Sequence, residues 1–425
     1  MKKVSLTIFL VFFCSLVFSQ ISIDYCQKKA RENYPLYRNF NLLEKTSNFT
    51  IENTKRNYLP QVNFSIKTSY QSDVTKIDFD LPFPMNIDFP EMKKDQYQAF
   101  LEIGQLIWDG GLTSNKKKEA KAELESQNST LEVELYNLKD RIANIFFGIL
   151  SIKEQKTQAL LMEKELGRNI KQIEAYIESG LANQSDLDLI KVEELTIKQR
   201  ISEIEIMEKT YIKLLSIFIG EELSVDAEFS EPELKVYNLS NNIFRPELKV
   251  FDSQIKLIDI KKRLVNNLSM PQISAFAQGG YGRPALNMFN EDFDFYGIIG
   301  LRLNWNISSL YTKSNKINIL EVNKQLVESN RNAFLFNTNI QLENQNSEIS
   351  RLESQLKRDN EIIQLRERIK KASEFKLENG TISVSDYIKD VNAEDISKQN
   401  QILHRIQLLM SIYKYNNIIN QPYEK

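Results

Sequence analysis

The sequence predicts a mixed α/β membrane protein built from a duplicated unit, with four β-strands and several long coiled-coil helices in each chain. Three observations predict this class. A set of proline, glycine and aspartate motifs occurs twice, which indicates an internal repeat. Apolar residues recur every seven positions in two long proline-free stretches, and four short segments alternate apolar and polar residues.

Two copies of one unit account for the duplication. Pro60 and Gln61, which are expected to open a strand, recur as Pro271 and Gln272 with an offset of 211 positions. A repeat of this length predicts two halves with the same architecture, related by pseudo-symmetry. Residues that mark a helical hairpin recur with an offset of 200 positions, and they are Gly180 with Asp186 and Gly380 with Asp386.

The segment 1–19 is expected to be a secretory signal peptide. A basic start and an apolar run over residues 4–18 precede Ser19, so the mature chain is predicted to begin at Gln20. No later stretch approaches twenty apolar residues, which argues against a helical membrane protein. Loss of two lysines with the signal changes the net charge from −2 to −4, which does not favour nucleic-acid binding. Cys26 is then the only cysteine, and a half-buried position without an intrachain disulfide is expected for it.

The mature chain is predicted to consist of two repeats joined by an acidic linker at 220–245. Each repeat is expected to hold a helix, two strands and a long helical hairpin, in that order. The linker is expected to form a belt around the middle of the protein. The predicted ranges are 20–219 for the first repeat, with strands in 61–108 and the hairpin in 112–219, and 246–425 for the second, with strands in 272–305 and the hairpin in 308–419.

The hairpin helices are predicted from a seven-residue repeat. No proline occurs between Pro90 and Pro232, or between Pro284 and Pro422, so long helices can run through both stretches. A heptad sustained over several turns specifies a left-handed coiled coil, and single amphipathic helices on an ordinary core are the alternative. The heptad residues are Leu124, Leu131, Leu138, Ile145 and Ile152 in the first copy, and Leu335, Leu342, Ile349, Leu356 and Ile363 in the second.

Each long helix is expected to contain about 65 residues and to be about 100 Å long. The return helices, near 186–219 and 386–419, are only about half that length. Shorter helices before the Pro-Gln motifs, near 36–58 and 247–268, could supply the missing half by stacking end to end with the return helices.

The four alternating segments are expected to be strands. Segments of about ten residues with one apolar and one polar face fit a membrane barrel with a wet interior, although a soluble sheet with one buried face would give the same pattern. Four strands cannot close a barrel, because about eight are needed. Three copies of the chain would pool twelve strands under cyclic symmetry. The segments are 62–70, 97–103, 273–277 and 295–305.

Candidates for chemistry are few, and no catalytic residue, metal site or cofactor is expected. His404 is the only histidine and lies within a predicted helix, which favours a structural or surface role. The run Lys116, Lys117 and Lys118 lies where a strand gives way to a helix. This run is expected to be a solvated junction, with contact to lipid head groups as the alternative.

The order of these motifs resembles that of the TolC-like outer-membrane efflux proteins, over nearly the whole mature chain. The resemblance implies a homotrimer with a twelve-stranded barrel in outer-membrane lipid and a helical tunnel in the periplasm. It implies a passive exit duct for efflux or type I secretion, docked to a periplasmic adaptor (membrane fusion) protein and an inner-membrane efflux pump or ABC transporter. The matching segments are Tyr-Leu-Pro-Gln at 58–61, Leu-Ile-Trp-Asp-Gly-Gly at 106–111, Met-Pro-Gln at 270–272, Leu-Asn-Trp-Asn at 303–306, and the two Gly-to-Ser-Asp stretches at 180–186 and 380–386.

The resemblance also implies that the tunnel closes at its periplasmic tip, just after the hairpin glycines, where acidic residues ring the pore. Asp186 and Asp386 match those acids by position, and first-turn acids that stabilise the return helices are the alternative interpretation. Lys389 stands where the family has a second acid, and Ile382 replaces an arginine that latches neighbouring helices. The bonds that close the tip are therefore expected to differ in this chain.

A soluble periplasmic adaptor is the main alternative function, because adaptors also present coiled-coil hairpins. An adaptor would need one hairpin between the halves of a small β domain. This chain instead has two predicted hairpins and two pairs of strands long enough to cross a membrane.

Overall fold

The structure of the protein is a computed structural model that describes residues 20–74, 92–233, 243–288, 290 and 292–420. The expected signal peptide and most of the segment between the first two predicted strands lie outside these residues. Within the described ranges, every helix is too short or too polar to cross a membrane.

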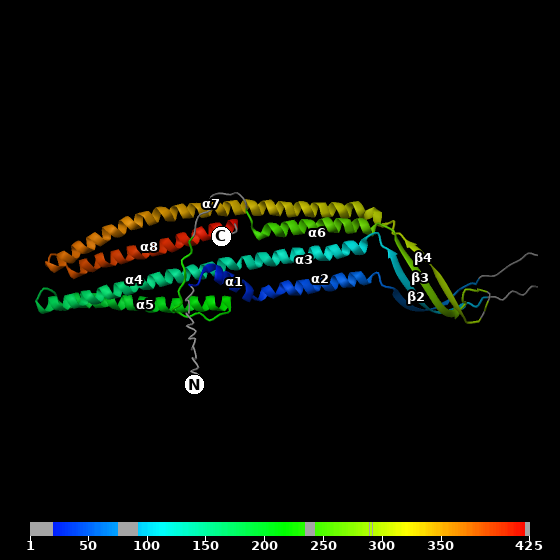
Figure 1. The fold of residues 1–425 in the computed structure, drawn as a ribbon, viewed down its shortest axis with the longest axis horizontal. Helices are drawn as coiled ribbons and strands as arrows, with labels where there is room; N and C mark the ends of the chain where they lie inside the picture. Colours follow the sequence, from blue (N-terminus) through cyan, green and yellow to red (C-terminus); the bar gives the residue numbers. More distant parts are fainter. Residues whose placement is uncertain (1–19, 75–91, 234–242, 289, 291, 421–425) are drawn as a thin grey trace, which may run out of the picture. The chain divides into compact units, whose positions relative to one another are not determined.

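The chain divides into two compact units, and each unit takes segments from both sequence repeats (Figure 1). The hairpin unit comprises 1–37, 132–245 and 334–425, and the sheet unit comprises 38–131 and 246–333. The repeats that the sequence reveals are therefore not the units that pack together. Each repeat contributes half of each unit.

The sheet unit contains one antiparallel sheet of four strands, in the order β1-β2-β3-β4. The strands are β1 (Gln61–Tyr70), β2 (Asp95–Trp108), β3 (Gln272–Arg283) and β4 (Asp294–Asn304). Each predicted strand segment coincides with one of these strands. The prediction for β3 stopped too early, because the glycines at 279, 280 and 282 interrupt the apolar alternation while the backbone pairing continues to Arg283.

The register of the sheet places apolar residues on one face and polar residues on the other. Residues that pair directly across strands point to the same side of a sheet. One row therefore joins Val62, Ile103, Ala277 and Ile299, whose side chains are apolar. The next row, on the opposite face, contains Asn63, Glu102, Gln278 and Ile298.

The apolar face is open to its surroundings, while the polar face is partly covered. Ile299 is 85% exposed and Phe295 is 80% exposed. On β3, the residues of the polar face are half-buried or buried, whereas Ala277, Gly279 and Tyr281 on the apolar face are exposed. This is the reverse of a soluble sheet, in which the apolar face is the covered one.

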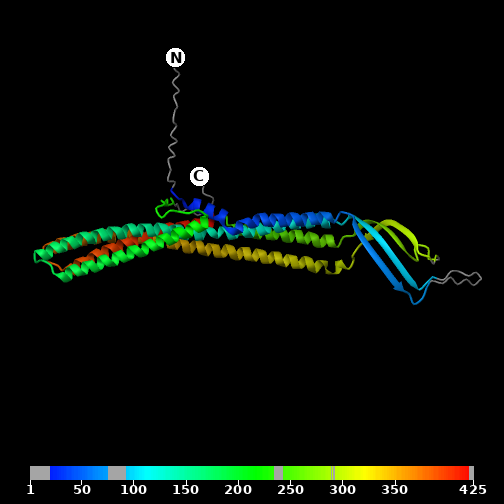
Figure 2. The same ribbon diagram turned by 90° about the horizontal axis from the view of Figure 1, so that it is seen from below.

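Four helices adjoin the sheet in the same unit, namely α2 (Asn39–Arg56), α3 (Leu112–Tyr136), α6 (Pro246–Leu268) and the first part of α7 (Ser309–Glu378). They lie side by side in Figures 1 and 2. Polar contacts connect neighbours: the Ser47 hydroxyl of α2 donates to the Ala120 carbonyl of α3 at 3.2 Å. Lys256 of α6 pairs with Glu125 of α3 at 2.5 Å.

The hairpin unit consists of two antiparallel helical hairpins and one short helix. The first hairpin is α4 (Leu138–Glu178) with α5 (Gln184–Ile219), and the second is the rest of α7 with α8 (Val384–Ile419). The uninterrupted length of α7, 70 residues, confirms the long helix expected for the second repeat. In the first repeat, only Asn137 separates α3 from α4, and its helical dihedral angles and bond to the Val133 carbonyl keep the two nearly continuous.

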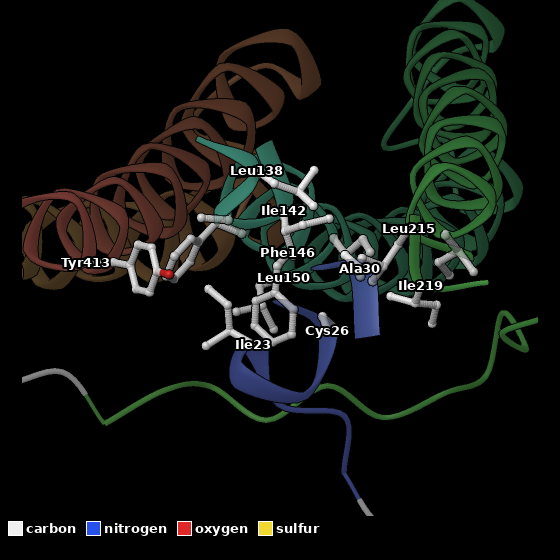
Figure 3. Close-up of a cluster of buried hydrophobic side chains, with 14 of the residues drawn as sticks. Ile23, Cys26, Ala30, Leu138, Ile142, Phe146, Leu150, Leu215, Ile219 and Tyr413 are labelled. Atoms are coloured by element: carbon white, nitrogen blue, oxygen red, sulfur yellow. The ribbon is translucent and has the colours of Figure 1, made fainter. Parts of the chain in front are cut away.

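A hydrophobic cluster lies where α1 (Ile23–Asn33) packs against α4 and α5 (Figure 3). Phe146 and Phe147 of α4 are both almost fully buried there, and their rings meet edge to face. Cys26 of α1 has no exposed surface, so the expectation of a half-buried residue was wrong. Burial raises the pKa of its thiol to about 12, which leaves it protonated and inert at neutral pH.

The described part of the linker binds the residues just before α1. Ile21 forms a parallel bridge with Phe229, and its backbone N–H donates to the Glu228 carbonyl at 2.9 Å. The Phe229 ring packs edge to face on Phe146 at 5.7 Å between centroids. Arg405 of α8 pairs with Glu231 at 2.7 Å, so the linker also contacts the second hairpin.

Candidate functional site

The two hairpin turns have the same geometry, as the duplicated motif predicts. Gly180 and Gly380 have φ angles of 72° and 66°, which lie in the left-handed region that favours glycine. After each glycine, a backbone N–H reaches back to the helix: Leu181 donates to the Tyr176 carbonyl and Thr381 to the Lys376 carbonyl, both at 2.8 Å. This is the Schellman arrangement that satisfies the last carbonyls of a helix. The glycines thus end α4 and α7 as expected.

Asp186 lies in the first turn of α5 and takes part in a capping box. The Asn183 side chain accepts a bond from the Asp186 N–H, and the Asp186 carboxylate accepts one from the Asn183 N–H, both at 3.1 Å. These bonds satisfy two backbone donors at the start of the helix. The first-turn role considered as the alternative is therefore present, and Asp186 is half-buried at the turn.

Asp386 occupies the matching place in α8 and has different partners. Ser383 is the N-cap, and its hydroxyl donates to the Asp386 carboxylate at 2.8 Å. Lys389, one turn further on, donates to the same carboxylate at 3.0 Å. The Lys389 ammonium and the Ser383 hydroxyl hold the pKa of Asp386 below its usual value. With side chains 58% and 72% exposed, this Asp-Lys pair is a surface contact.

Ile382, the position where the resemblance implied a latching arginine, lies half-buried beside the cluster that joins the two hairpins. That cluster contains Leu166 and Ile173 of α4, Ile190 of α5 and Val391 of α8. In this chain, the position therefore contributes apolar packing between hairpins.

The Pro-Gln motifs stand at the start of β1 and β3. Gln61 is the first residue of β1, and its side-chain amide donates to the Leu59 carbonyl at 3.1 Å. Gln272 is the first residue of β3 and pairs with Asn304 of β4. Proline lacks an N–H, so Pro60 and Pro271 each stand just outside the hydrogen-bonded ladder.

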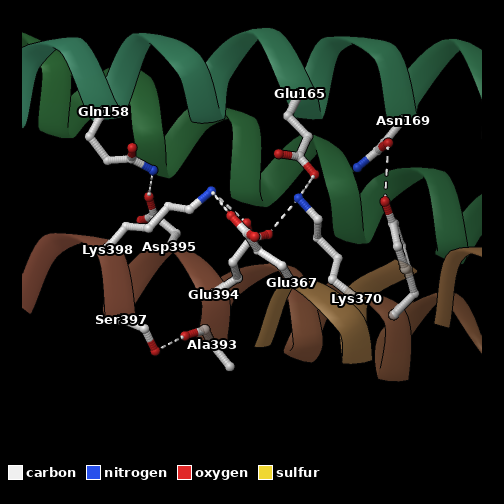
Figure 4. Close-up of polar contacts among 11 residues, drawn as sticks. Gln158, Glu165, Asn169, Glu367, Lys370, Ala393, Glu394, Asp395, Ser397 and Lys398 are labelled. Carbon is white, nitrogen blue, oxygen red and sulfur yellow. Dashed lines mark hydrogen bonds and ion pairs between the residues drawn. The ribbon is translucent and has the colours of Figure 1, made fainter. Parts of the chain in front are cut away.

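Sequence reasoning missed a charged network between the hairpins, shown in Figure 4. Lys370 of α7 donates to Glu165 of α4 at 2.8 Å and also pairs with Glu394 of α8. Lys398 pairs with Glu394 at 2.6 Å and with Glu367 of α7 at 3.3 Å. Glu394 is nearly buried, with a side chain 5% exposed. The Lys370 ammonium therefore joins three helices, α4, α7 and α8.

A second carboxylate extends this network to α5. Asp395 of α8 accepts from Gln158 of α4 at 2.9 Å and from Arg200 of α5 at 3.3 Å. Together, Glu394 and Asp395 connect all four helices of the two hairpins. They lie about 20 Å along the helix from Gly380, given the rise of 1.5 Å per residue.

The electrostatics of the network favour its charged form. Burial alone would raise the pKa of Glu394, but hydrogen bonds from Lys370 and Lys398 outweigh burial and hold the pKa below its usual value. Burial would lower the pKa of Lys370, but bonds to Glu165 and Glu394 raise it above its usual value. Each charge is thus compensated by an opposite charge within hydrogen-bond distance.

The sequence contained one local signal for this network, the spacing of Glu394 and Lys398, which allows an i,i+4 pair on one helix. The other partners are far apart in the sequence. Glu165 and Lys370 are separated by 205 positions, so only the packing of the hairpins brings them together.

No catalytic or metal-binding arrangement is found in the part of the chain that the structure describes. No group of three histidine, cysteine or acidic side chains there could hold a metal ion. The half-buried His404 contacts Asp359 of α7 through Nδ1 at 2.6 Å, which connects α8 to α7. This contact agrees with the structural role expected for the histidine.

The fold is that of the TolC-like outer-membrane efflux channels, defined by a four-stranded antiparallel sheet and two long helical hairpins per chain. No family profile matches the sequence, and no curated protein matches it either. The likeness is therefore one of structure.

Three solved structures illustrate it. The outer membrane protein VceC from Vibrio cholerae has a TM-score of 0.66 at 10% identity, covering 95% of this chain and 97% of that one. The Campylobacter jejuni outer membrane channel CmeC has a TM-score of 0.66 at 12% identity, covering 96% and 88%. The open state of the Neisseria gonorrhoeae outer membrane channel MtrE has a TM-score of 0.64 at 10% identity, covering 93% and 88%.

Proposed function

We propose that this protein is an outer-membrane channel that serves as a passive exit duct for efflux or type I secretion. Three copies would join their sheets into a barrel of twelve strands in the outer membrane. Their helices would form a tunnel in the periplasm, which would dock to a periplasmic adaptor protein and an inner-membrane transporter. This proposal makes the protein a channel and not an enzyme.

The observation that carries the proposal is the sheet, with its exposed apolar face and its sheltered polar face. An exposed row such as Val62, Ile103 and Ile299 is unfavourable in water but suits contact with lipid. The opposite face has charges that suit a wet lumen, since Arg302 pairs with Glu102 at 3.0 Å across β3.

The edges of the sheet support the pooling of strands. Among the described residues, β1 and β4 each pair on one side only. Unpaired backbone groups cannot be left in lipid, because no water is there to bond them. Pairing of β4 with β1 of the next copy would close the barrel and satisfy both edges.

The strand lengths also fit a membrane. The four strands contain 10, 14, 12 and 11 residues. A tilted strand of about 9 to 11 residues crosses the hydrocarbon layer. Each strand is therefore long enough to span the membrane.

The hairpin turns would form the periplasmic tip of the tunnel. Three copies of the half-buried Asp186 and the exposed Asp386 near a constriction would create a negative potential that favours cations. Lys389 neutralises part of this charge through its bond to Asp386. Opening of the tip would require the two hairpins to move apart, and the network around Glu394 opposes that movement.

The test combines location, mass and conductance. The full chain should fractionate with the outer membrane, keep the mass of a trimer in mild detergent and form pores in planar bilayers. Recovery in the soluble periplasm as a monomer would support the adaptor alternative instead. The purified protein should also bind the adaptor encoded beside it. Loss of this binding after substitutions at the hairpin turns would show that the adaptor contacts the turns.

A further inference from the structure

We infer that the sheet ends of the four helices in the sheet unit form a basic collar that binds anionic phospholipid head groups of the inner leaflet. The inference rests on the proposed function, because it requires the sheet to lie in a membrane. It concerns a surface that the duct itself does not need, namely the helix segments 50–56 of α2, 112–121 of α3, 259–268 of α6 and 309–318 of α7.

Charge is strongly biased in these four segments. The whole chain has a net charge of −2, yet here eleven basic residues face only three acidic ones, Glu52, Glu119 and Asp259. Every one of the four helices contributes at least two of the basic residues. They are Lys55, Arg56, Lys116, Lys117, Lys118, Lys121, Lys261, Lys262, Arg263, Lys313 and Lys316.

Five of these residues, all near the starts of α3 and α7, do not stabilise the folded chain through an ion pair with another described residue or through the helix dipole. We name Lys116, Lys117, Lys118, Lys313 and Lys316 the junction lysines. They lie within the first eight residues of α3 and α7, near the helix N-termini, where the helix dipole gives a cation no advantage. Among the described residues, none of them forms an ion pair. By contrast, Lys262 of α6 is paired with Glu321.

Exposed aromatic side chains lie at the periplasmic ends of the strands and in the first turn of α7. Trp108 at the end of β2 is 43% exposed, and Trp305 just after β4 is 48% exposed. Tyr311, in the first turn of α7, is 82% exposed. Tryptophan and tyrosine gather where hydrocarbon meets the head groups, so this level marks the membrane boundary.

The distances place the lysines at the head groups. Lys116 and Lys118 are four and six residues into α3, about 6 and 9 Å along the helix axis from its start. The head-group layer is about 5 to 8 Å thick on each side of the hydrocarbon. Lysine side chains reach several ångströms further along such a surface. A trimer would present fifteen junction lysines around its circumference at this depth.

The occupant that fits is a phosphodiester with a net negative charge anchored in the leaflet, such as phosphatidylglycerol. Asp109, just before α3, is a further acidic residue at the junction, but it is only 2% exposed. Its carboxylate accepts bonds from the N–H groups of Gly111 and Thr113, at 3.0 and 2.7 Å. The outward surface at this level is therefore basic, aromatic and complementary to a layer of lipid phosphates.

The experiment compares lipid retention by three full-length proteins. The first is the natural chain, and the second has the five junction lysines replaced by Gln. The control has five exposed lysines of the hairpin unit replaced by Gln, which gives the same net charge: Lys164, Lys171, Lys191, Lys371 and Lys376. Each protein is reconstituted in vesicles of phosphatidylcholine with one quarter phosphatidylglycerol, extracted gently, and analysed by native mass spectrometry.

We expect the natural chain and the control to retain phosphatidylglycerol in preference to phosphatidylcholine. Each lysine near an anionic surface contributes about fivefold to partitioning, so the junction variant should lose this preference by about tenfold or more. Equal enrichment in the junction variant would overturn the inference.

A salt series with the natural chain gives a second test that needs no variant. The Debye length falls from about 10 Å at 0.1 M salt to about 3 Å at 1 M, so the preference should fall over this range. A preference that does not change with salt would contradict a collar of exposed charges. Failure of the natural chain to enter vesicles of pure phosphatidylcholine would instead count against the proposed function, because the sheet needs no anionic lipid to insert.

Discussion

Lys370 of α7 donates a hydrogen bond to Glu165 of α4 at 2.8 Å, and this contact joins the two helical hairpins across 205 positions of sequence. The same ammonium pairs with Glu394 of α8, whose second partner is Lys398 at 2.6 Å. Both hairpins are thereby bound at one largely buried point. Separation of the hairpins would leave these charges unpaired in a region from which water is mostly excluded.

Replacement of Lys370 by Met should lower the free energy of unfolding of the hairpin unit by about 1 to 3 kcal/mol, because Glu165 loses its partner and Glu394 keeps only Lys398. The change would be seen as a lower midpoint of thermal unfolding measured by circular dichroism. Lys371→Met is the matched control, since Lys371 is adjacent and exposed. Equal shifts in the two variants would show that the network does not stabilise the hairpins.

Stability should depend on pH through Glu394 at the acid end. Its pKa is held below the ordinary 4.5, so the folded protein gains stability from this group above about pH 4.5 and loses it as the pH falls through the folded value. Glu394→Gln should flatten this acid limb between about pH 5 and 3. An acid limb of unchanged steepness in the variant would show that other carboxylates cause it.

At alkaline pH, two lysines of the same network make stability fall as the pH rises. The pKa values of Lys370 and Lys398 lie above the ordinary 10.5, because their carboxylate partners outweigh burial. Their contribution is complete below about pH 10.5 and is lost as the pH rises through the folded values. Unfolding midpoints should therefore form a plateau between about pH 5 and 10.

The acids at the hairpin turns can be tested for charge and for capping separately. Replacing Asp186 and Asp386 together by Asn keeps an oxygen that can accept the capping bonds but removes both charges. If the charges act on the pore, the Asn pair and an Ala pair should both alter single-channel conductance and reduce cation preference. Only the Ala pair should also lower the unfolding temperature. Conductance in the Asn pair identical to that of the natural chain would leave the acids as helix caps only.

Lys389 should contribute to the closed state of the tip. Lys389→Ala removes the 3.0 Å bond to Asp386 and leaves that acid unneutralised in each copy. We expect greater repulsion between copies and increased entry of large antibiotics into cells that produce the variant. Unchanged antibiotic sensitivity at equal protein levels would show that the pair does not hold the tip.

A charged substitution on the apolar face of the sheet should destabilise the folded protein more than one on the polar face. Leu301 is 73% exposed on the apolar face, and Leu301→Arg should cost about 2 to 4 kcal/mol near the middle of the bilayer. Asn304→Arg is the control on the opposite face of the same strand, where Arg302 already occurs. The readout is the yield of folded protein in vesicles, and equal yields would argue for a soluble sheet.

Two glycines of α4 should respond oppositely to alanine. A Cβ on Gly148 would lie 2.4 Å from Cε1 of Tyr211 on α5, so Gly148→Ala should force the hairpin helices apart and destabilise them. A Cβ on Gly167 would meet nothing within 4 Å. Gly167→Ala should therefore stabilise the helix by about 0.5 to 1 kcal/mol. Thermal shifts of the same sign would contradict this difference.

Residue preferences and apolar periodicity were enough to predict most of the helices and strands. Gly180 and Gly380 end their helices because left-handed backbone geometry strains other residues, and this preference can be read without knowing any contact. The heptads predicted long helices because a seven-residue repeat keeps one apolar stripe facing a partner. Alternation predicted the strands in the same way, but it stopped five residues before the end of β2 and six before the end of β3, where glycines have no side chain to alternate.

Tertiary structure alone decided which of these elements pack together. The compact units draw on both repeats, and Cys26 is fully buried because α1 packs on α4 and α5. Lys370 contacts Glu165 because the two hairpins lie against each other at one particular rotation and offset. Charged residues on helices are common, and their spacing along one helix says nothing about a partner on another. The sequence by itself therefore determined the elements and many of their ends, whereas the charged network between the hairpins and the arrangement of the basic segments beside the sheet depend on how those elements pack.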